Sequence, residues 1–271
     1  MSDAATDVLT HAIEWAQAGG RVARDRLGAA VASRKADQSP VTDADHAVQA
    51  LILDAIAVRY PRHAVLTEET IGRPERHARV TEAEWCWVID PIDGTRNYAR
   101  GLPIFVTSVA VLCQGVPVAG VVYDVMAGHT YSACAGGGAW RDGARLAVAD
   151  NPVSHDMIVG APAGNGNPMP RPVHEWLDRT SMRNLGATAL HLAMVAAGCM
   201  DAAVCFRSNL WDIAAGALLV AEAGGTVTDL EGKLHFPVSG EWLARPSRTP
   251  YLAAGPNLHR CLLATWNVVR E

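Results

Sequence analysis

The residues best suited to chemistry are two aspartates, Asp90 and Asp93, which stand three positions apart in the segment DPIDGT. An apolar run at 85–89 precedes them and predicts a buried strand that stops at Asp90. Pro91 fixes the following turn, and Gly94 allows the backbone to approach a ligand closely. Both carboxylates can therefore point into one space, where paired carboxylates suit hard, oxygen-seeking cations.

The backbone amides that follow, at Gly94 and Thr95, can hold a phosphate oxygen, as nests of N–H groups do. The structural alternative is a plain turn, because Asp at a strand end and Asp-Gly pairs are common in turns. Taken alone, the segment leaves both interpretations open.

For the further acidic residues, a purely structural role is a strong alternative to a chemical one. Glu68 and Glu69 end another short strand candidate, where a solvated loop by itself explains them better. Thr42 and Asp45 fit a capping box at the start of a helix, which needs no function but does not exclude one. Asp212 lies near the start of a later helix, where the helix dipole favours a carboxylate.

Composition narrows the class of function. The chain has 271 residues and a formal net charge of -5, and its lack of a basic run argues against a nucleic-acid partner. It has no apolar stretch of the roughly 20 residues that span a membrane, and no signal peptide is recognised. We therefore expect a cytoplasmic protein whose six cysteines are buried, reduced thiols. No P-loop, GxSxG or HExxH motif occurs, and His46, His63 and His191 are expected to be surface or packing residues.

The elements that must position these residues divide the chain near Asp150, into regions 1–150 and 151–271. The first region is expected to contain helices at 4–27 and 43–58, then a mostly antiparallel sheet, and in the second region strands and helices alternate. The expected strands are 64–67, 85–89, 105–113, 118–123, 130–134, 157–160 and 202–206. The later helices are expected at 188–197, 211–223 and 256–269. Loops are expected at 33–40 and 161–172.

Together these segments resemble the inositol monophosphatase family, which are lithium-sensitive, magnesium-dependent phosphatases. The first family motif is similar to residues 87–98 (WVIDPIDGTRNY), and the second is similar to 211–216 (WDIAAG), which continues to EAGG at 222–225. Between them, 136–143 resembles the glycine-rich hairpin of the family. The order and spacing match from Lys35 to at least Gly225. The resemblance implies an α+β/α/β fold, a layered α/β/α/β/α sandwich of the inositol monophosphatase type.

The resemblance also implies roles for the matching residues. Thr95 and Glu68 would orient an attacking water, and Asp45 would form a hydrogen bond with Thr95. Lys35 matches the lysine of the family's mobile active-site loop. The implied ligands of two or three Mg2+ ions are the side chains of Glu68, Asp90, Asp93 and Asp212 and the carbonyl of Ile92. The implied phosphate- or substrate-binding residues are Asp93, Gly94, Thr95, Gly186, Ala187, Thr188, Cys205, Arg207 and Asp212.

The expected reaction is hydrolysis of a small phosphate ester by metal-activated water, in a protein that forms a homodimer and binds neither nucleic acid nor membrane. Inositol 1-phosphate or a similar polyol phosphate is the first choice of substrate. Cys205 stands where the inositol-phosphate members carry Glu, and a thiol is a weak acceptor. Arg207 either meets a second anionic group or is a surface arginine.

These departures keep other substrates open, namely histidinol phosphate, fructose 1,6-bisphosphate and 3′-phosphoadenosine 5′-phosphate. An alternative of another class is a catalytically idle regulatory or binding protein of the same fold. Loss of Asp90, Asp93, Thr95 or Asp212 would favour the idle alternative, and all four are present.

Overall fold

A computed structural model describes residues 3–29, 32–34, 40–68, 80–162, 170–238 and 249–270. The helices in these ranges are α1 (Asp3–Arg26), α2 (Asp43–Arg59), α4 (Thr95–Tyr98), α5 (Arg171–Leu177), α6 (Thr188–Ala196), α7 (Leu210–Glu222) and α9 (Pro256–Arg270). The strands are β1 (Ala32–Arg34), β2 (Pro40–Thr42), β3 (Ala64–Thr67), β4 (Trp85–Asp93), β5 (Val106–Cys113), β6 (Val116–Asp124), β7 (His129–Cys134), β8 (Gly138–Arg141), β9 (Ala144–Arg145), β10 (Ile158–Gly160), β11 (Ser181–Arg183), β12 (Ala202–Ser208), β13 (Thr226–Thr228) and β14 (Thr249–Ala254).

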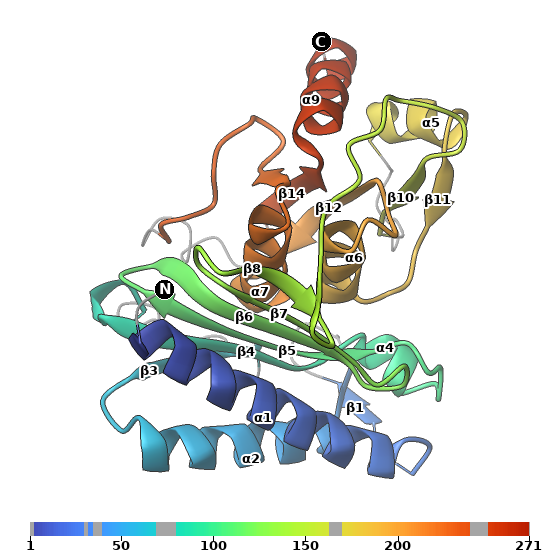
Figure 1. Ribbon diagram of the computed structural model, residues 1–271. Helices are drawn as coiled ribbons and strands as arrows, with labels where there is room; N and C mark the ends of the chain where they lie inside the picture. Colours follow the sequence, from blue (N-terminus) through green and yellow to red (C-terminus); the bar gives the residue numbers. More distant parts are fainter. Residues whose placement is uncertain are drawn as a thin grey trace.

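Helices and sheets alternate in five layers (Figure 1). α1 and α2 lie side by side against the outer face of a seven-stranded sheet with the order β3-β4-β5-β6-β7-β8-β9. α6 and α7 separate it from a five-stranded sheet with the order β11-β10-β12-β14-β13, whose far face carries α5 and α9. The expected layered sandwich is confirmed.

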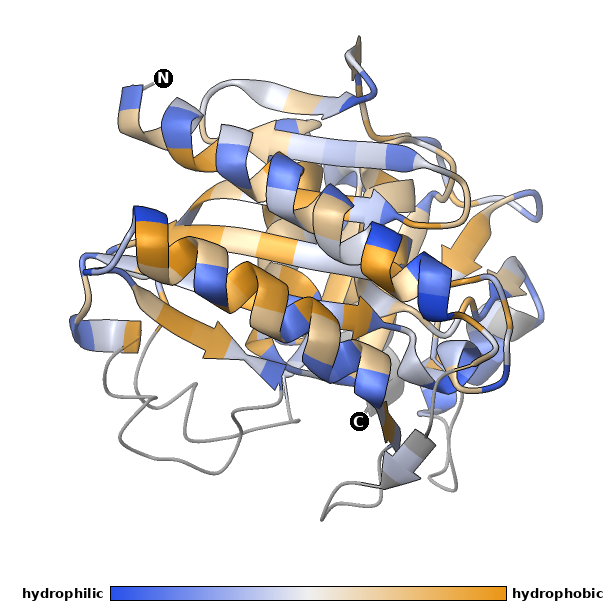
Figure 2. Cartoon of the chain, turned by 90° about the horizontal axis from the view of Figure 1, so that it is seen from below, coloured by the Kyte–Doolittle hydropathy of each residue, from blue (hydrophilic) through white to orange (hydrophobic). Residues whose placement is uncertain are grey.

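The two outer helices pack on the sheet because each has an apolar face. α1 buries Val8, Ala12 and Trp15, which recur at helical spacing. α2 begins with the expected capping box, in which the Thr42 N–H donates to Asp45 Oδ2 over 2.8 Å and the Asp45 N–H donates to Thr42 Oγ1. Figure 2 shows this side of the molecule, where hydrophobic and hydrophilic residues alternate around both helices.

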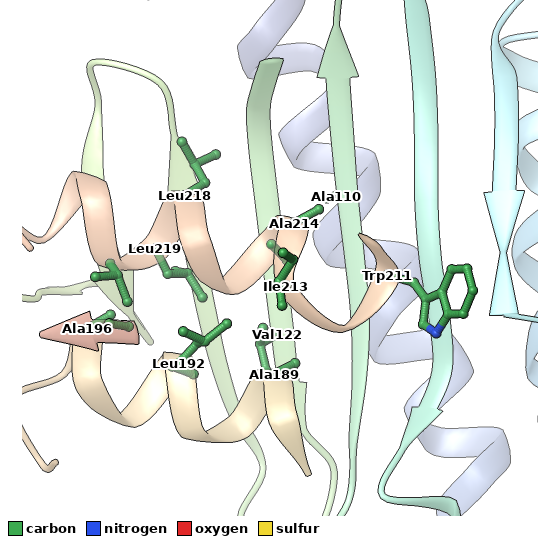
Figure 3. Close-up of a cluster of buried hydrophobic side chains, with 14 of the residues drawn as sticks. Ala110, Val122, Ala189, Leu192, Ala196, Trp211, Ile213, Ala214, Leu218 and Leu219 are labelled. Atoms are coloured by element: carbon green, nitrogen blue, oxygen red, sulfur yellow. The ribbon is translucent and has the colours of Figure 1, made fainter. Parts of the chain in front are cut away.

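The middle layer is packed at short range because glycines remove side chains from its contacts. A Cβ at Gly216 of α7 would lie 2.5 Å from the Cβ of Leu192 on α6. A Cβ at Gly120 of β6 would lie 3.0 Å from the Cα of Ala215 on α7. Small and branched apolar side chains fill the remaining space between the two helices and the sheet (Figure 3). The helices of this layer therefore have little freedom to shift against their neighbours.

Some of the expected strand and loop boundaries were wrong, because local sequence patterns carry no information about which strands pair. β4 continues to Asp93, since its pairing with β5 extends past the expected end at residue 89. The expected loop at 33–40 includes parts of the β1–β2 hairpin, and α5 begins inside the expected loop at 161–172. The division near Asp150 stays a prediction, although β9 ends at Arg145 and β10 begins at Ile158.

All six cysteines are free, as expected, but the expectation that all are buried was wrong. Cys199 and Cys261 are exposed, because Cys199 follows the end of α6 and Cys261 lies on the outer helix α9. Cys113, at the end of β5, is half-buried. In the part of the chain that the structure describes, no helix is long and apolar enough to cross a membrane.

Candidate functional site

A β-bulge brings the two motif aspartates to the same face of the seven-stranded sheet. Asp90 and Asp93 lie three residues apart, but their partners on β5 lie only two apart. Residues three apart on a regular strand point to opposite faces, and the extra residue of a bulge reverses that relation. Thr107 supports the bulge, since its Oγ1 donates to the carbonyl of Pro91 over 3.0 Å. Ile92 packs in the core on the opposite face.

A cavity of about 430 Å³ opens where these carboxylates emerge. Its wall combines the residue after β3, the bulge of β4, α4, the turn before α6, part of β12 and the start of α7. The predicted site residues on this wall are Glu68, Asp90, Ile92, Asp93, Gly94, Thr95, Gly186, Ala187, Thr188, Cys205, Arg207 and Asp212. Residues from both halves of the sequence therefore share one space.

Acidic side chains dominate the electrostatics of this cavity. Asp90 and Asp93 are only 2% and 8% exposed. Burial, followed by the charge of Glu68, raises the pKa of Asp90 well above its usual range. Burial raises the pKa of Asp93 to about 7, against the lowering effect of the N–H that Ala189 donates. Burial and the charge of Asp93 also raise the pKa of Asp212. Such crowding of like charges is unfavourable unless a cation joins them.

Gly94 and Thr95 turn the chain from β4 into α4. Gly94 has a φ of +102°, and a Cβ there would lie 3.0 Å from the carbonyl oxygen of Ile104. Glycine is therefore required by the backbone itself, a reason that the sequence analysis did not give. The Thr95 Oγ1 donates to the carbonyl of Ile92 over 3.0 Å, so the predicted water-orienting hydroxyl lies beside the predicted carbonyl ligand.

A second capping box holds Asp212 at the start of α7. The Asn209 N–H donates to Asp212 Oδ2 over 2.7 Å, so capping and cavity lining coexist in one side chain. On neighbouring β12, the Cys205 Sγ donates to the carbonyl of Arg207 over 3.1 Å. Burial raises the pKa of Cys205 to about 12, so this wall presents a neutral thiol next to the exposed Arg207.

The sequence analysis missed four polar residues of the cavity wall, Arg96, Asn97, Asn184 and Asn209. Asn97 joins two parts of the wall, because its Nδ2 donates to the carbonyls of Ile104 and Leu185 over 2.8 and 2.7 Å. Arg96 and Asn97 lie within the first motif and Asn209 lies two residues before the second, so these three could have been included on that ground. Nothing in the sequence places Asn184 near them.

His191 also lines the cavity, but as a packing residue. It is 4% exposed, and its Nε2 accepts a hydrogen bond from the Leu185 N–H over 3.0 Å. This nitrogen must therefore carry a lone pair, which means that the ring is neutral. Burial accordingly lowers the pKa of His191 to about 4.

Residues 4–269 match the inositol monophosphatase family. The chain belongs to this family. It is 36% identical over 239 residues to Nus factor SuhB of Escherichia coli K12, which covers 84% of this chain and 86% of that protein. It is 35% identical over 198 residues to an inositol-1-monophosphatase of Mesorhizobium japonicum, covering 71% and 73%. The structure of an IMPase from Thermotoga maritima matches with a TM-score of 0.83 at 30% identity, covering 97% of this chain and 98% of that one.

The inositol monophosphatase family generally uses Mg2+, and the donor atoms of the cavity fit such an ion. Carboxylate oxygens and the Ile92 carbonyl are hard oxygen ligands of the kind that Mg2+ prefers. Among the described residues, no three acidic, histidine or cysteine side chains are already gathered into a closed metal cage.

Two of the predicted catalytic residues of this chain, Lys35 and Asp45, are not among the described residues that line the cavity. Lys35 lies outside the described residues, as does Glu69 of the acidic pair. Asp45 is fully buried and accepts hydrogen bonds from both the backbone N–H and the Oγ1 of Thr42. Its predicted hydrogen bond with Thr95 stays a prediction.

Proposed function

We propose that this member of the inositol monophosphatase family is a Mg2+-dependent phosphomonoesterase of small phosphorylated metabolites. The observation that carries the proposal is the convergence of four acidic side chains, those of Glu68, Asp90, Asp93 and Asp212, on one cavity. A volume of about 430 Å³ suits a substrate of metabolite size. The raised pKa values of the buried aspartates are typical of groups that need a cation to ionise together.

In the proposed mechanism, the four carboxylates and the Ile92 carbonyl would hold two or three Mg2+ ions. Bound Mg2+ would supply positive charge to neutralise the phosphate dianion and would lower the pKa of the attacking water, so that the water loses its proton more easily. Thr95 and Glu68 orient that water, and Asp45 supports the Thr95 hydroxyl. The backbone N–H groups of Gly94 and Thr95 receive a phosphate oxygen.

The other half of the cavity determines the substrate. A polyol phosphate such as inositol 1-phosphate is our first choice, with Gly186, Ala187 and Thr188 along its path. Cys205 offers the substrate a neutral thiol, and Arg207 offers a positive charge at an exposed position. Arg207 supports the alternative, a substrate with a second anionic group such as fructose 1,6-bisphosphate or 3′-phosphoadenosine 5′-phosphate.

Phosphate release from a substrate panel tests the function. The panel contains inositol 1-phosphate, histidinol phosphate, fructose 1,6-bisphosphate and 3′-phosphoadenosine 5′-phosphate, each with Mg2+ and with excess chelator. We expect Mg2+-dependent release that millimolar lithium inhibits. If every substrate stays intact in the presence of Mg2+, the phosphatase proposal fails for these metabolites.

A matched pair of variants tests the role of Arg207. Arg207→Gln should raise the KM of the two bisphosphates more than that of inositol 1-phosphate. Arg100→Gln changes an exposed arginine outside the cavity wall and should alter none of these constants. Equal effects of Arg207→Gln on all substrates would exclude a selective contact with the second anionic group.

A second candidate function is binding or regulation without catalysis. It is favoured by the name of the relatives, Nus factor SuhB, which does not describe a hydrolase. The same panel decides between the two functions, because an idle protein would release no phosphate. We also propose that the protein is cytoplasmic, forms a homodimer and binds no nucleic acid. Light scattering checks the dimer, and titration with RNA checks the lack of nucleic-acid binding.

A further inference from the structure

One buried side chain beside the cavity is not explained by the fold. Tyr251 on β14 pairs in register with Cys205 on β12, so both side chains project from the same face of the five-stranded sheet. Both belong to the core formed with α6 and α7. Cys205 lines the cavity and Tyr251 does not, so the Tyr251 side chain lies beside the cavity wall, next to Cys205.

The Tyr251 hydroxyl has no hydrogen-bond partner within the described residues, although the side chain is 0% exposed. Buried hydroxyls in native proteins almost always have a partner, because leaving one unpaired costs its full desolvation penalty. The equally buried Tyr98 follows this rule, since its hydroxyl donates to the carbonyl of Ala23 over 2.8 Å. The missing partner of Tyr251 is therefore expected to belong to a state with a ligand bound.

The surroundings of the hydroxyl indicate which group that partner is. Burial raises the pKa of Tyr251 well above its usual range, and the electrostatic influence of Cys205, Asp93 and Asp212 adds to this effect. A tyrosine hydroxyl is a hydrogen-bond donor at neutral pH, and the two carboxylates among these groups are acceptors. The Cys205 thiol already donates to the carbonyl of Arg207. The Asp93 Oδ2 already accepts the N–H of Ala189.

Asp93 is engaged by the backbone N–H groups of Thr188, Ala189 and Leu190 at the start of α6, whereas Asp212 is engaged by Asn209 alone among the described residues. Within the described residues, its hydrogen bonds, from the backbone N–H and the Nδ2 of Asn209, all engage Oδ2. Its other oxygen, Oδ1, is left to meet a different group. Asp212 lies in the first turn of α7, which packs against β14, the strand that carries Tyr251.

We propose that Tyr251 is a positioning residue of the site, whose hydroxyl donates a hydrogen bond to the Asp212 carboxylate, directly or through one buried water, when Mg2+ binds. This proposal rests on the metal-binding role of Asp212 in the proposed function. Groups that donate a hydrogen bond to a metal ligand fix the orientation of that ligand and strengthen metal binding. The hydroxyl acts through Asp212 and does not touch the substrate.

The test compares Tyr251→Phe with the wild type in thermal melts over a Mg2+ titration, which needs no catalytic activity. Without Mg2+, the variant should melt at the same or a higher temperature, because it loses only an unpartnered hydroxyl. With Mg2+, its apparent dissociation constant should be about tenfold larger. Tyr131→Phe is the control, since Tyr131 is a buried tyrosine of the seven-stranded sheet that does not line the cavity. It should leave the Mg2+ constant unchanged.

Several outcomes would overturn the proposal. An unchanged Mg2+ constant in Tyr251→Phe, or a lower melting temperature of this variant without Mg2+, would show that the hydroxyl has no such role. A higher KM with normal Mg2+ binding would mean that it contacts substrate instead. A wild type that Mg2+ stabilises but that hydrolyses nothing would contradict the proposed phosphatase and leave the role of Tyr251 intact.

Discussion

The carboxylate of Asp93 accepts a hydrogen bond from the backbone N–H of Ala189 over 2.5 Å, although 96 positions separate the two residues in sequence. The contact joins the end of β4 to the first turn of α6, where the helix N-terminus favours a negative charge. A single side chain thus links the acidic half of the cavity to the half that we expect to bind substrate.

Asp93→Asn separates the structural role of this side chain from its proposed chemical role. The amide keeps a carbonyl oxygen for the Ala189 N–H, so the fold should remain intact, but one ligand charge is lost. We expect turnover to fall by more than about a hundredfold. Phosphate release with saturating Mg2+ measures this, and Asp54→Asn on the exposed side of α2 is the matched control. Near-normal turnover would exclude the assigned role.

Mg2+ should stabilise the folded protein, because it relieves the repulsion among the cavity carboxylates. At a concentration a hundred times the dissociation constant, the expected gain in the free energy of unfolding is about 2.7 kcal/mol. Thermal melting with MgCl2, compared with NaCl of equal ionic strength, measures the gain. Glu68→Gln should reduce it. A melting temperature that does not respond to Mg2+ would contradict the proposed metal site.

Glu222 fastens the end of α7 to the glycine-rich hairpin, and this contact should matter for stability. Its two carboxylate oxygens accept the N–H groups of Gly136 and Gly138 over 2.7 and 2.8 Å. Glu222→Gln places an NH2 group against one of these donors, so the free energy of unfolding should fall by about 1–2 kcal/mol. Urea unfolding measures the change. Glu231→Gln removes an exposed ion pair with Lys233 and should have almost no effect.

His191 should make the protein sensitive to mild acid. The pKa of His191 is about 4 in the folded protein, because of burial, and about 6.5 in an unfolded chain. Between these values the unfolded state binds a proton that the folded state does not, so stability falls as pH falls from 6.5 toward 4. Between pH 7 and pH 5 this should cost about 2 kcal/mol.

The variant His191→Gln isolates this effect. Its side-chain carbonyl can accept the Leu185 N–H at any pH, so the variant should lose about 2 kcal/mol less than the wild type between pH 7 and pH 5. Urea unfolding at both pH values gives the difference. The comparison with wild type is needed because the buried aspartates have the opposite effect on stability. Carboxyl groups whose pKa is raised in the folded state make the folded protein more stable as pH falls. Equal losses in both proteins would contradict the prediction.

Much of the local structure was predictable from short-range rules. The capping box of Thr42 and Asp45 and the run of β-branched and apolar residues in β5 and β6 act within a few residues, so the sequence indicates them directly. The extension of β4 to Asp93 was not predictable, because pairing with β5 and not local propensity continues the strand.

The sequence by itself determined which residues can do the chemistry, namely the two acidic motifs, their order and the family to which they belong. Only the tertiary structure decided which residues meet. The bulge turns Asp90 and Asp93 to one face, the α6 N-terminus reaches Asp93, and Tyr251 comes to lie beside Cys205. The physical reason is that strand register and layer packing depend on contacts between residues far apart in the chain, which no local pattern records.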